Sequence, residues 1–467
     1  MRLKGNSGAD DRGERRMAEI VTIRDEGLGN SSYLVDLGDG RGLVVDPSRG
    51  PGPYLAAAAH RGLRLAYTAE THLHADFVSG SRELTARGAT LLAPATAHLK
   101  FPYRGLGGGD EVDLGGLTLR ALATPGHTPE HLAWLLADGA RPLALFSGGS
   151  LLVGAVARTD LISPDRTEEL ARAVWRSLHE RILTLPDDLT VYPTHGAGSF
   201  CSAPTGAEPT TTIGRETATN PLLAAADEDA FVKLLLGGLG SYPRYFLRLR
   251  EVNRRGPRVY GTTPPRLAPL PPRQVRRLVA EGAELVDARP IAAFAAGHVP
   301  GALSIPLRSA FATWLGWLVD DQRPLIVVAD RDSDRGDLVR QALKIGYERL
   351  AGELAGGMAA WEAAGLPVAR IPLVGLDDLQ GRRVLDVRQD AEFAAGHIPG
   401  SAHVELSALT HQPRGLPGGP LAVICGHGER AMTAASLLAR QGRNDLTVVD
   451  GGTSAWTHAG RRLEPGP

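Results

Sequence analysis

Residues 284–307, ELVDARPIAAFAAGHVPGALSIPL, return later in the chain as residues 383–406, RVLDVRQDAEFAAGHIPGSAHVEL. A second pair of matching segments follows, GGMAAWEAAGLPV from Gly356 and GGTSAWTHAGRRL from Gly451. An internal repeat fixes the fold of the region that it spans, because each copy must form the same unit. Two copies of one domain are therefore predicted, a first repeat over residues 269–370 and a second repeat over residues 371–467.

Each copy has the sequence pattern of a small α/β domain. Apolar, β-branched runs such as LIVVAD (325–330) and LAVIC (421–425) precede segments of helical composition, DLVRQALKIG and AMTAASLLARQG. Alternation of this kind predicts a parallel sheet flanked by helices. A duplicated core without an active site is the alternative explanation of the repeat.

Length and composition indicate an ordinary globular chain of about three domains, at roughly 100 to 200 residues per domain. The 467 residues are 43% hydrophobic and 22% charged, and 51 Lys and Arg balance 52 Asp and Glu. This balance argues against a dedicated nucleic-acid or membrane-surface binder. The first residues lack the apolar core of a secretory signal, and no later stretch reaches the ~18 apolar residues of a membrane span. A cytoplasmic protein is expected, with a disordered extension over residues 1–16.

One of the two cysteines, Cys425, lies between the apolar run LAVI and a predicted helix. Backbone N–H groups at a helix start favour an anion, so the Cys425 thiolate should be stabilised and nucleophilic. Glycines at 426 and 428 allow the loop to curl, and Arg430 can hold an anionic group. The alternative is a buried thiol that acts as a small hydrophobe. The predicted catalytic loop consists of Cys425, Gly426, His427, Gly428, Glu429 and Arg430.

On these residues the second repeat resembles the rhodanese sulfurtransferases. The shared motifs are the Cys-x-x-Gly-x-Arg loop, Asp386 and Arg388 before the turn from Gly396 to Gly400, and Gly451, Gly452 and Trp456. The resemblance implies that Cys425 accepts a sulfane sulfur as a persulfide and passes it to sulfite or cyanide. Related cysteine phosphatases have a loop one residue longer, so the spacing here favours sulfur over phosphate. In the first repeat Asp330 aligns with Cys425, which predicts a pseudo-rhodanese domain because a carboxylate cannot form a persulfide.

Residues 17–250 are predicted to form a separate domain, and residues 251–268 a Pro/Arg-rich linker to the first repeat. This domain carries histidines after strand-like stretches. His72, His74 and Asp76 alternate after LRLAYTAE, His127 lies in a Pro-Gly turn, and His195 follows another strand end. Together they predict a metal site. For any single histidine, an ordinary hydrogen-bonded role is the alternative.

The set resembles the metallo-β-lactamase fold, an αββα sandwich, and within it the persulfide dioxygenases. The supporting motifs are the context of Asp76, Thr124 to Thr128, the turn Arg158 to Asp160, and ETATNPLL. The resemblance implies a mononuclear Fe(II) held by His72, His127 and a later Asp, with Arg158 meeting the substrate carboxylate. Asp76 and His195 would complete or line the site.

Two positions depart from the family pattern. Phe77 stands where the last histidine of the first motif belongs, which argues against a second zinc site. Gly149 stands where the family has the metal-binding Asp. The site must therefore use His72, His74 and His127 as three neutral donors, recruit Asp76, or bind metal weakly. Three histidines suit Fe(II), and Zn(II) is the alternative.

The order of the three domains resembles bacterial fusions of a persulfide dioxygenase with a sulfurtransferase. The resemblance implies that the chain oxidises glutathione persulfide or a similar small persulfide to sulfite, and that Cys425 then transfers sulfur to give thiosulfate. Two alternatives stay open: a sulfurtransferase with a degenerate N-terminal domain, and a zinc hydrolase in that domain. The sequence also leaves open whether the chain forms a homo-oligomer, and whether Cys201 is an inert thiol or a relay near the metal.

Overall fold

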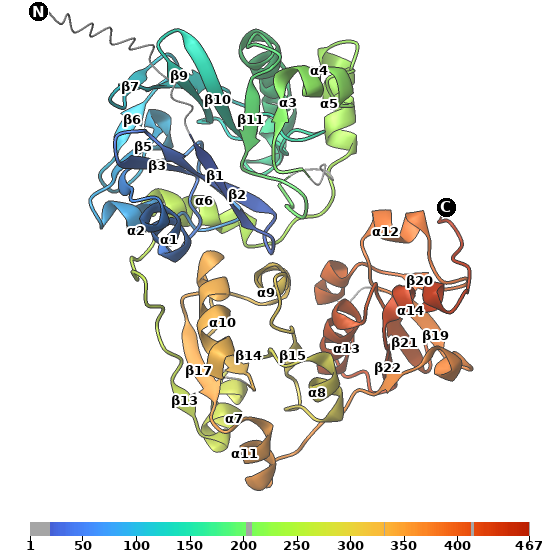
Figure 1. Ribbon diagram of the computed structural model, residues 1–467. Coiled ribbons are helices and arrows are strands. Elements are labelled where there is room, and N and C mark those ends of the chain that lie inside the picture. Colours follow the sequence, from blue (N-terminus) through green and yellow to red (C-terminus); the bar gives the residue numbers. More distant parts are fainter. Residues whose placement is uncertain (1–18, 202–207, 331, 412–414, 467) are drawn as a thin grey trace, which may run out of the picture.

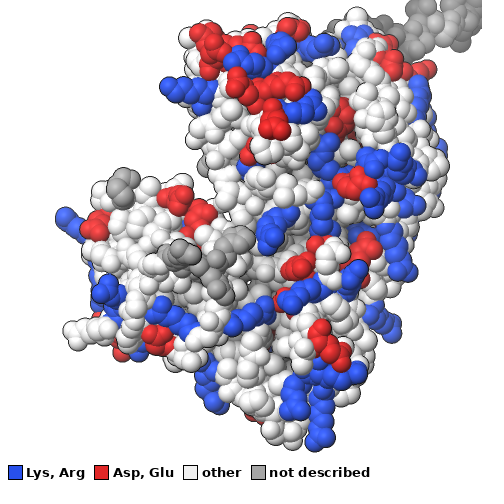
Figure 2. Space-filling view, turned by 180° about the vertical axis from the view of Figure 1, so that it is seen from behind, with Lys and Arg blue, Asp and Glu red and all other residues white. Residues whose placement is uncertain are grey.

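The computed structural model describes residues 19–201, 208–330, 332–411 and 415–466. The chain folds into an N-terminal lobe and two smaller α/β units, with the second repeat beside the first (Figure 1). The predicted extension, residues 1–16, lies outside the described residues. No helix in the described ranges combines the length and apolarity needed to cross a bilayer. Basic and acidic side chains are interspersed over the face shown in Figure 2, as the nearly balanced charge predicts.

The N-terminal lobe contains two six-stranded sheets packed face to face. Successive side chains of a strand point to opposite faces of the sheet. Tyr33 and Val35 therefore enter the core between the two sheets, whereas Leu34 is buried on the opposite face of the first sheet. The first sheet has the order β1 Ile20–Asp25, β2 Asn30–Asp36, β3 Arg41–Val45, β4 Arg64–Ala69, β5 Thr90–Pro94 and β6 Arg104–Leu106. The second has the order β12 Thr211–Thr212, β11 Thr190–Pro193, β10 Arg141–Gly148, β9 Leu132–Asp138, β8 Thr118–Ala123 and β7 Glu111–Asp113.

Helices cover the outer face of each sheet, which confirms the predicted αββα sandwich. Tyr54 of α1 and Leu84 of α2 pack with Leu34 on the first sheet. Val174 of α3 and Phe231 of α5 pack on the second sheet. The helices of this lobe are α1 Gly52–His60, α2 Ser81–Thr85, α3 Thr167–Ser177, α4 Ile213–Thr219, α5 Glu228–Gly237 and α6 Phe246–Arg255.

Both repeats contain a five-stranded sheet of parallel strands with the same order, which confirms the predicted α/β repeat. The first repeat has β13 Pro269–Leu270, β17 Leu350–Leu354, β16 Leu325–Val328, β14 Glu284–Asp287 and β15 Leu303–Ser304. The second has β18 Leu373–Val374, β22 Leu446–Val449, β21 Leu421–Ile424, β19 Arg383–Asp386 and β20 Ala402–His403. Their helices are α7 Pro272–Ala280, α8 Ile291–Ala296, α9 Phe311–Leu318, α10 Asp332–Lys344, α11 Gly357–Ala363, α12 Asp390–Ala395, α13 Glu429–Arg440 and α14 Gly452–His458.

The predicted linker differs from the structure at its start. Residues 251–255 continue helix α6, which ends at Gly256 with a φ of 93°. The charged side chains of this segment suggested a solvated connector, but Leu249 and Asn253 form a buried face on the same helix. Basic residues Arg254 and Arg255 in its last turn are favourable beside the negative end of the helix dipole.

The first repeat is fastened to the N-terminal lobe by buried and half-buried polar contacts. Arg49 pairs with Glu348 at 2.7 Å, Lys344 pairs with Asp25 at 2.5 Å, and Thr313 of α9 donates to the Gly27 carbonyl at 2.8 Å. Gly27 itself lies so close to this repeat that a Cβ there would stand 2.0 Å from the Ser309 carbonyl oxygen. The first repeat is therefore packed directly against the lobe that carries the histidines.

The second repeat packs on the first through helix α13. Ser304 of β15 donates its N–H to Ser436 Oγ at 3.0 Å, and Arg440 pairs with Glu284 at 2.8 Å. At the start of this helix, a Cβ on Gly428 would lie 3.1 Å from Ile291 Cδ1. The Cys425 loop is thus built against a side chain of the first repeat.

Candidate functional site

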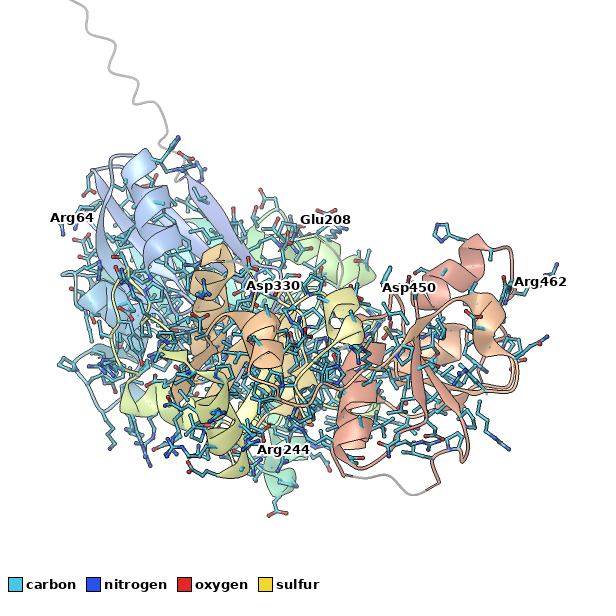
Figure 3. The ribbon with its side chains drawn as sticks, turned by 90° about the horizontal axis from the view of Figure 1, so that it is seen from below. Arg64, Glu208, Arg244, Asp330, Asp450 and Arg462 are labelled. Carbon is cyan, nitrogen blue, oxygen red and sulfur yellow. The ribbon has the colours of Figure 1, made fainter. Side chains whose placement is uncertain are left out.

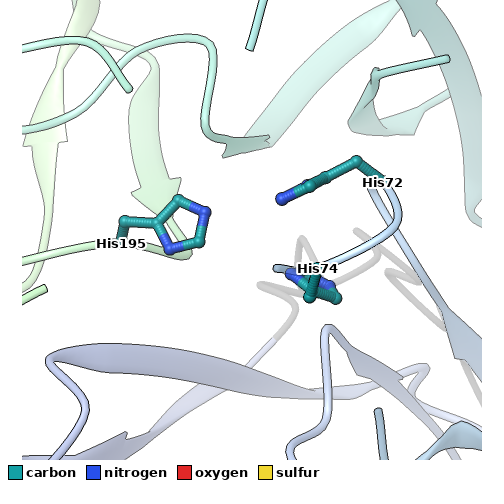
Figure 4. A group of neighbouring side chains, drawn as sticks. All are labelled: His72, His74 and His195. Atoms are coloured by element: carbon teal, nitrogen blue, oxygen red, sulfur yellow. The ribbon is translucent and has the colours of Figure 1, made fainter. Parts of the chain in front are cut away.

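Four buried histidines, the histidine cluster, come together where strands of the sandwich end. His72 and His74 follow β4, His127 follows β8, and His195 follows β11. Each is at most 2% exposed. The His72 ring centroid lies 4.2 Å from that of His74, 4.8 Å from that of His127 and 5.4 Å from that of His195. Figure 4 shows His72, His74 and His195 directed toward a common space.

One ring nitrogen of each histidine is held by a neighbour. Thr71 Oγ1 donates to Asp46, so it accepts from His72 Nδ1 at 2.8 Å. His127 Nδ1 donates to the Arg158 carbonyl at 2.6 Å, and His195 Nδ1 lies 3.2 Å from Asn30 Oδ1. In His74 the held nitrogen is Nε2 instead of Nδ1, since His74 Nε2 lies 2.9 Å from Glu70 Oε2.

The other ring nitrogens have no partner among the described residues. These are Nε2 of His72, His127 and His195 and Nδ1 of His74, all of them buried. A buried polar atom without a hydrogen bond costs about 1–3 kcal/mol, so several at one point indicate a missing ligand. Metal-binding histidines are oriented in this way, with the outer nitrogen held and the inner one free. The residues present therefore fit a divalent metal.

The electrostatics separate the histidines into two kinds. Burial lowers the pKa of His72 and His127, which keeps both imidazoles neutral as metal ligands must be. Burial also acts on His74, but the carboxylates of Asp46 and Glu70 raise the pKa of His74 to about 10. His74 therefore carries a proton unless a cation displaces it from Nδ1.

Sequence reasoning missed three polar residues that hold the histidine cluster in place. Asp46 accepts from the Thr71 N–H at 2.7 Å and from Thr194, and so joins the loops before His72 and His195. Glu70 orients His74, and His131 is enclosed by Thr124 and Gly149. In the sequence, Asp46 shows only as a carboxylate directly after the apolar run GLVV, which does not by itself indicate a support. The structure adds that Asp46 has a left-handed conformation, with a φ of 47°.

Gly149 cannot carry the carboxylate that the family pattern places there. A Cβ at this position would stand 2.6 Å from His127 Cδ2 and 2.9 Å from His127 Cγ. Its N–H donates to His131 Nε2 at 3.0 Å, which fixes the backbone beside both rings. The His127 ring therefore occupies the space that a side chain at 149 needs.

We expect Gly149→Ala to destabilise the protein, because the His127 ring must move. The expected cost is about 1–3 kcal/mol of unfolding free energy, as for other overpacked buried positions. Chemical denaturation measures it, with Gly237→Ala as the matched control, since a Cβ at Gly237 meets no atom within 4 Å. Equal stability of the two variants would show that the space beside His127 is larger than described.

Arg158 lies in the predicted turn but faces the protein interior. Its guanidinium pairs with Asp160 at 2.7 Å and donates to the carbonyls of Phe200 at 3.0 Å and Gly240 at 2.9 Å. The residue is 2% exposed. These contacts favour a role in holding the chain around the site, in place of the expected contact with a substrate carboxylate.

Asp76 and Cys201 lie beside the histidine cluster. An Asp76 carboxylate oxygen is 3.1 Å from His195 Nδ1. Cys201 is fully buried, and burial together with the Asp76 carboxylate raises the pKa of its thiol. Tyr245 closes this side, donating its hydroxyl to the Asp76 carbonyl at 3.1 Å.

The Cys425 loop joins strand β21 to helix α13. Cys425 follows β21, Gly428 donates its N–H to Cys425 Sγ at 3.1 Å, and α13 begins at Glu429. Gly428 has a φ of 115°, a left-handed conformation that favours glycine. Arg430 is paired with Glu392 at 2.6 and 2.8 Å, so an incoming anion must compete with a carboxylate. His427 is exposed at the tip of the loop.

The first repeat presents a carboxylate at the corresponding place. Asp330 is exposed after β16, and Figure 3 labels it at the middle of the molecule. Asp330 lines a cavity of about 430 Å³ with Arg289 and Arg308, and Glu429 of the Cys425 loop reaches the same cavity. Residues of both repeats therefore line this cavity.

Comparisons with known proteins agree with this architecture. The model of the Rhodanese-like domain matches residues 271–364 and 375–459. The human mitochondrial persulfide dioxygenase ETHE1 is 31% identical over 202 residues, which cover 41% of this chain and 70% of that protein. A hydroxyacylglutathione hydrolase of Rhizobium meliloti is 30% identical over 219 residues, which cover 40% of this chain and 78% of that protein. The chain belongs to the persulfide dioxygenase–rhodanese fusions.

A solved structure extends the likeness of this fusion beyond the sandwich. The metallo-β-lactamase from Staphylococcus aureus superposes with a TM-score of 0.63 at 29% identity, covering 73% of this chain and 99% of that one. The fusion is thus an enzyme that joins a metallo-β-lactamase fold to rhodanese domains, and its histidine cluster fits a metal cofactor.

Proposed function

We propose that the fusion couples metal-dependent oxidation of a small persulfide, such as glutathione persulfide, to sulfur transfer by Cys425 that yields thiosulfate. One observation carries the proposal. A single chain holds both a histidine cluster with unpartnered buried nitrogens and a cysteine whose sulfur accepts an N–H at a helix start. The relatives add persulfide dioxygenases for the first site and rhodanese-like domains for the second.

The predicted metal ligands are His72, His74 and His127, each with one unpartnered nitrogen, and His195 lies beside them. We propose Fe(II) as the resident metal, with Zn(II) as the alternative. Bound iron would supply the capacity to bind and activate O2 beside the persulfide sulfur. The chain itself excludes bulk water, since every member of the cluster is buried, and Asp46, Glu70 and Thr71 hold the rings in place.

Sulfur transfer at Cys425 needs no outside oxidant or reductant. The Cys425 thiolate attacks the outer sulfur of a persulfide or of thiosulfate, the S–S bond of the donor breaks, and the donor leaves as a thiolate or as sulfite. Sulfite then attacks the outer sulfur on Cys425, which releases thiosulfate and restores the thiolate. The Gly428 N–H and the start of α13 favour negative charge on Cys425 Sγ.

Arg430 is expected to bind anionic donors more tightly when its partner is neutralised. Glu392→Gln should lower the KM for thiosulfate roughly two- to fivefold, since a partly exposed ion pair contributes about 0.2–1 kcal/mol. Steady-state kinetics with cyanide as acceptor measure this effect. Asp445→Asn is the control, because Asp445 pairs with Arg443 at 2.8 Å away from the Cys425 loop. An unchanged KM would mean that Arg430 does not bind the donor.

Gly149 favours a second candidate, a sulfurtransferase whose N-terminal lobe is a zinc hydrolase or has lost catalysis. The family carboxylate is missing and cannot be restored without moving His127. Hydroxyacylglutathione hydrolases among the relatives make hydrolysis a concrete alternative for this lobe.

Oxygen uptake separates the two candidates. The iron-loaded protein, given glutathione persulfide, is expected to consume O2 and to form sulfite. A zinc-loaded sample of the same protein is the control and should consume none. Absence of O2 uptake by protein that holds about one equivalent of iron would overturn the dioxygenase proposal and leave the sulfurtransferase.

A further inference from the structure

Cys201 lies close to two members of the histidine cluster, His127 and His195. Its sulfur and one ring nitrogen each of His127 and His195 lie within 4.8 Å of one another. Nε2 of both histidines is buried without a hydrogen-bond partner among the described residues. Both imidazoles are at most 1% exposed, so the thiol lies beside two buried histidines.

The backbone of one residue, Arg158, contacts both the cysteine and a histidine. The Arg158 N–H donates to the Cys201 carbonyl at 2.7 Å, and the Arg158 carbonyl accepts from His127 Nδ1 at 2.6 Å. The Arg158 guanidinium also donates to the carbonyl of Phe200, the preceding residue. The Phe200 ring in turn packs against Trp317 of the first repeat at 5.4 Å. The position of Cys201 is therefore fixed by the hydrogen bond from Arg158 and by the packing of the preceding residue, Phe200, on the first repeat.

The histidine cluster lacks the anionic ligand that the sequence pattern leads one to expect. Position 149 has no side chain, and a Cβ there would collide with His127. Imidazoles are neutral, and the Asp76 carboxylate lies 3.1 Å from His195 Nδ1. A thiolate at Cys201 would offset a further part of the charge of a divalent ion in this buried site. Thiolates are also strong ligands for zinc, cobalt and iron.

We infer that Cys201, as a thiolate beside His127 and His195, supplies the anionic metal ligand that Gly149 cannot. This inference rests on the proposed metal site. When the metal binds, the Cys201 thiol loses its proton to solvent and the sulfur forms the bond to the ion, so no change of oxidation state is involved. Loss of the family carboxylate is thereby compensated by a residue from another loop.

Cobalt substitution tests the inference without relying on activity. A Co(II)-loaded Cys425→Ser protein, in which Cys201 is the one remaining cysteine, should show the intense near-ultraviolet absorption of thiolate-to-cobalt charge transfer. Adding Cys201→Ser should remove this absorption and weaken cobalt binding at least about tenfold. Cobalt bound at one equivalent without the absorption would overturn the inference while leaving the metal site intact. Failure to bind cobalt at all would overturn both.

X-ray absorption of the zinc-loaded Cys425→Ser protein gives a second readout that does not require replacing Cys201. One sulfur at about 2.3 Å from zinc is the expected result. A zinc shell made only of nitrogen and oxygen at about 2.0–2.2 Å would overturn the inference even if Cys201→Ser fails to fold.

Discussion

Cys425→Ser is expected to abolish sulfur transfer from thiosulfate to cyanide. Without the thiolate no persulfide can form, so the rate should fall by at least about 10³-fold, the scale on which removal of a nucleophile acts. Serine keeps the size of the side chain, and the Gly428 N–H can still donate to it. The loop should therefore remain folded.

The matched control is Asp330→Ala, the corresponding position of the first repeat. Asp330 is exposed and cannot carry sulfur, so this variant should retain the rate of the unsubstituted protein. Intact-protein mass spectrometry after treatment with donor should show one added sulfur atom on the Asp330→Ala protein and none on Cys425→Ser. Transfer by the serine variant, or sulfur found on another residue, would refute the assignment of Cys425.

His127→Ala is expected to empty the metal site. The imidazole is buried, its Nδ1 is held by the Arg158 carbonyl, and its free Nε2 faces the histidine cluster. Loss of one ligand should weaken metal binding by at least about 10- to 100-fold, so the purified variant should hold much less iron or zinc. Elemental analysis by mass spectrometry measures the metal content.

His60→Ala serves as the control, because His60 is exposed at the end of α1. Its metal content should match that of the unsubstituted protein. Thiosulfate-to-cyanide transfer should stay normal in both variants, since Cys425 lies in another domain. Full metal content in His127→Ala would remove this residue from the ligand set.

The repeat and the Cys425 loop were predictable because their information is local. The thiol, its glycines and the following helix are contiguous, so chain order alone places the Gly428 N–H near the sulfur. The sandwich was expected from the resemblance of the histidine motifs to the metallo-β-lactamase fold. Strand β2 does not show its two faces in the sequence, because Tyr33, Leu34 and Val35 are consecutive apolar residues and all are buried. The histidines were also found, because each ends a strand and strand ends meet at one edge of a sheet.

The remaining features depend on contacts between distant segments. Asp46 holds Thr71 and Thr194, which are far from it in sequence, and no local pattern marks a lone carboxylate as a support. Arg158 was expected to bind a substrate carboxylate. Its guanidinium instead donates to the Phe200 and Gly240 carbonyls, contacts that depend on tertiary packing and are not visible in the sequence. Gly149 showed that a carboxylate is missing, but only the structure shows that His127 fills its space.

The close packing of Ile291 on Gly428 has a consequence for how such a chain can evolve. The first repeat has Asp330 in place of a nucleophile, yet it supplies the surface on which α13 and the reactive loop rest, through Ile291, Ser304 and Glu284. We therefore expect selection on this repeat to act on the surface that it presents to α13. Substitutions of Asp330 should be tolerated, whereas deletion of the first repeat should expose the face of the second repeat that packs on it and lower the rate of sulfur transfer by Cys425.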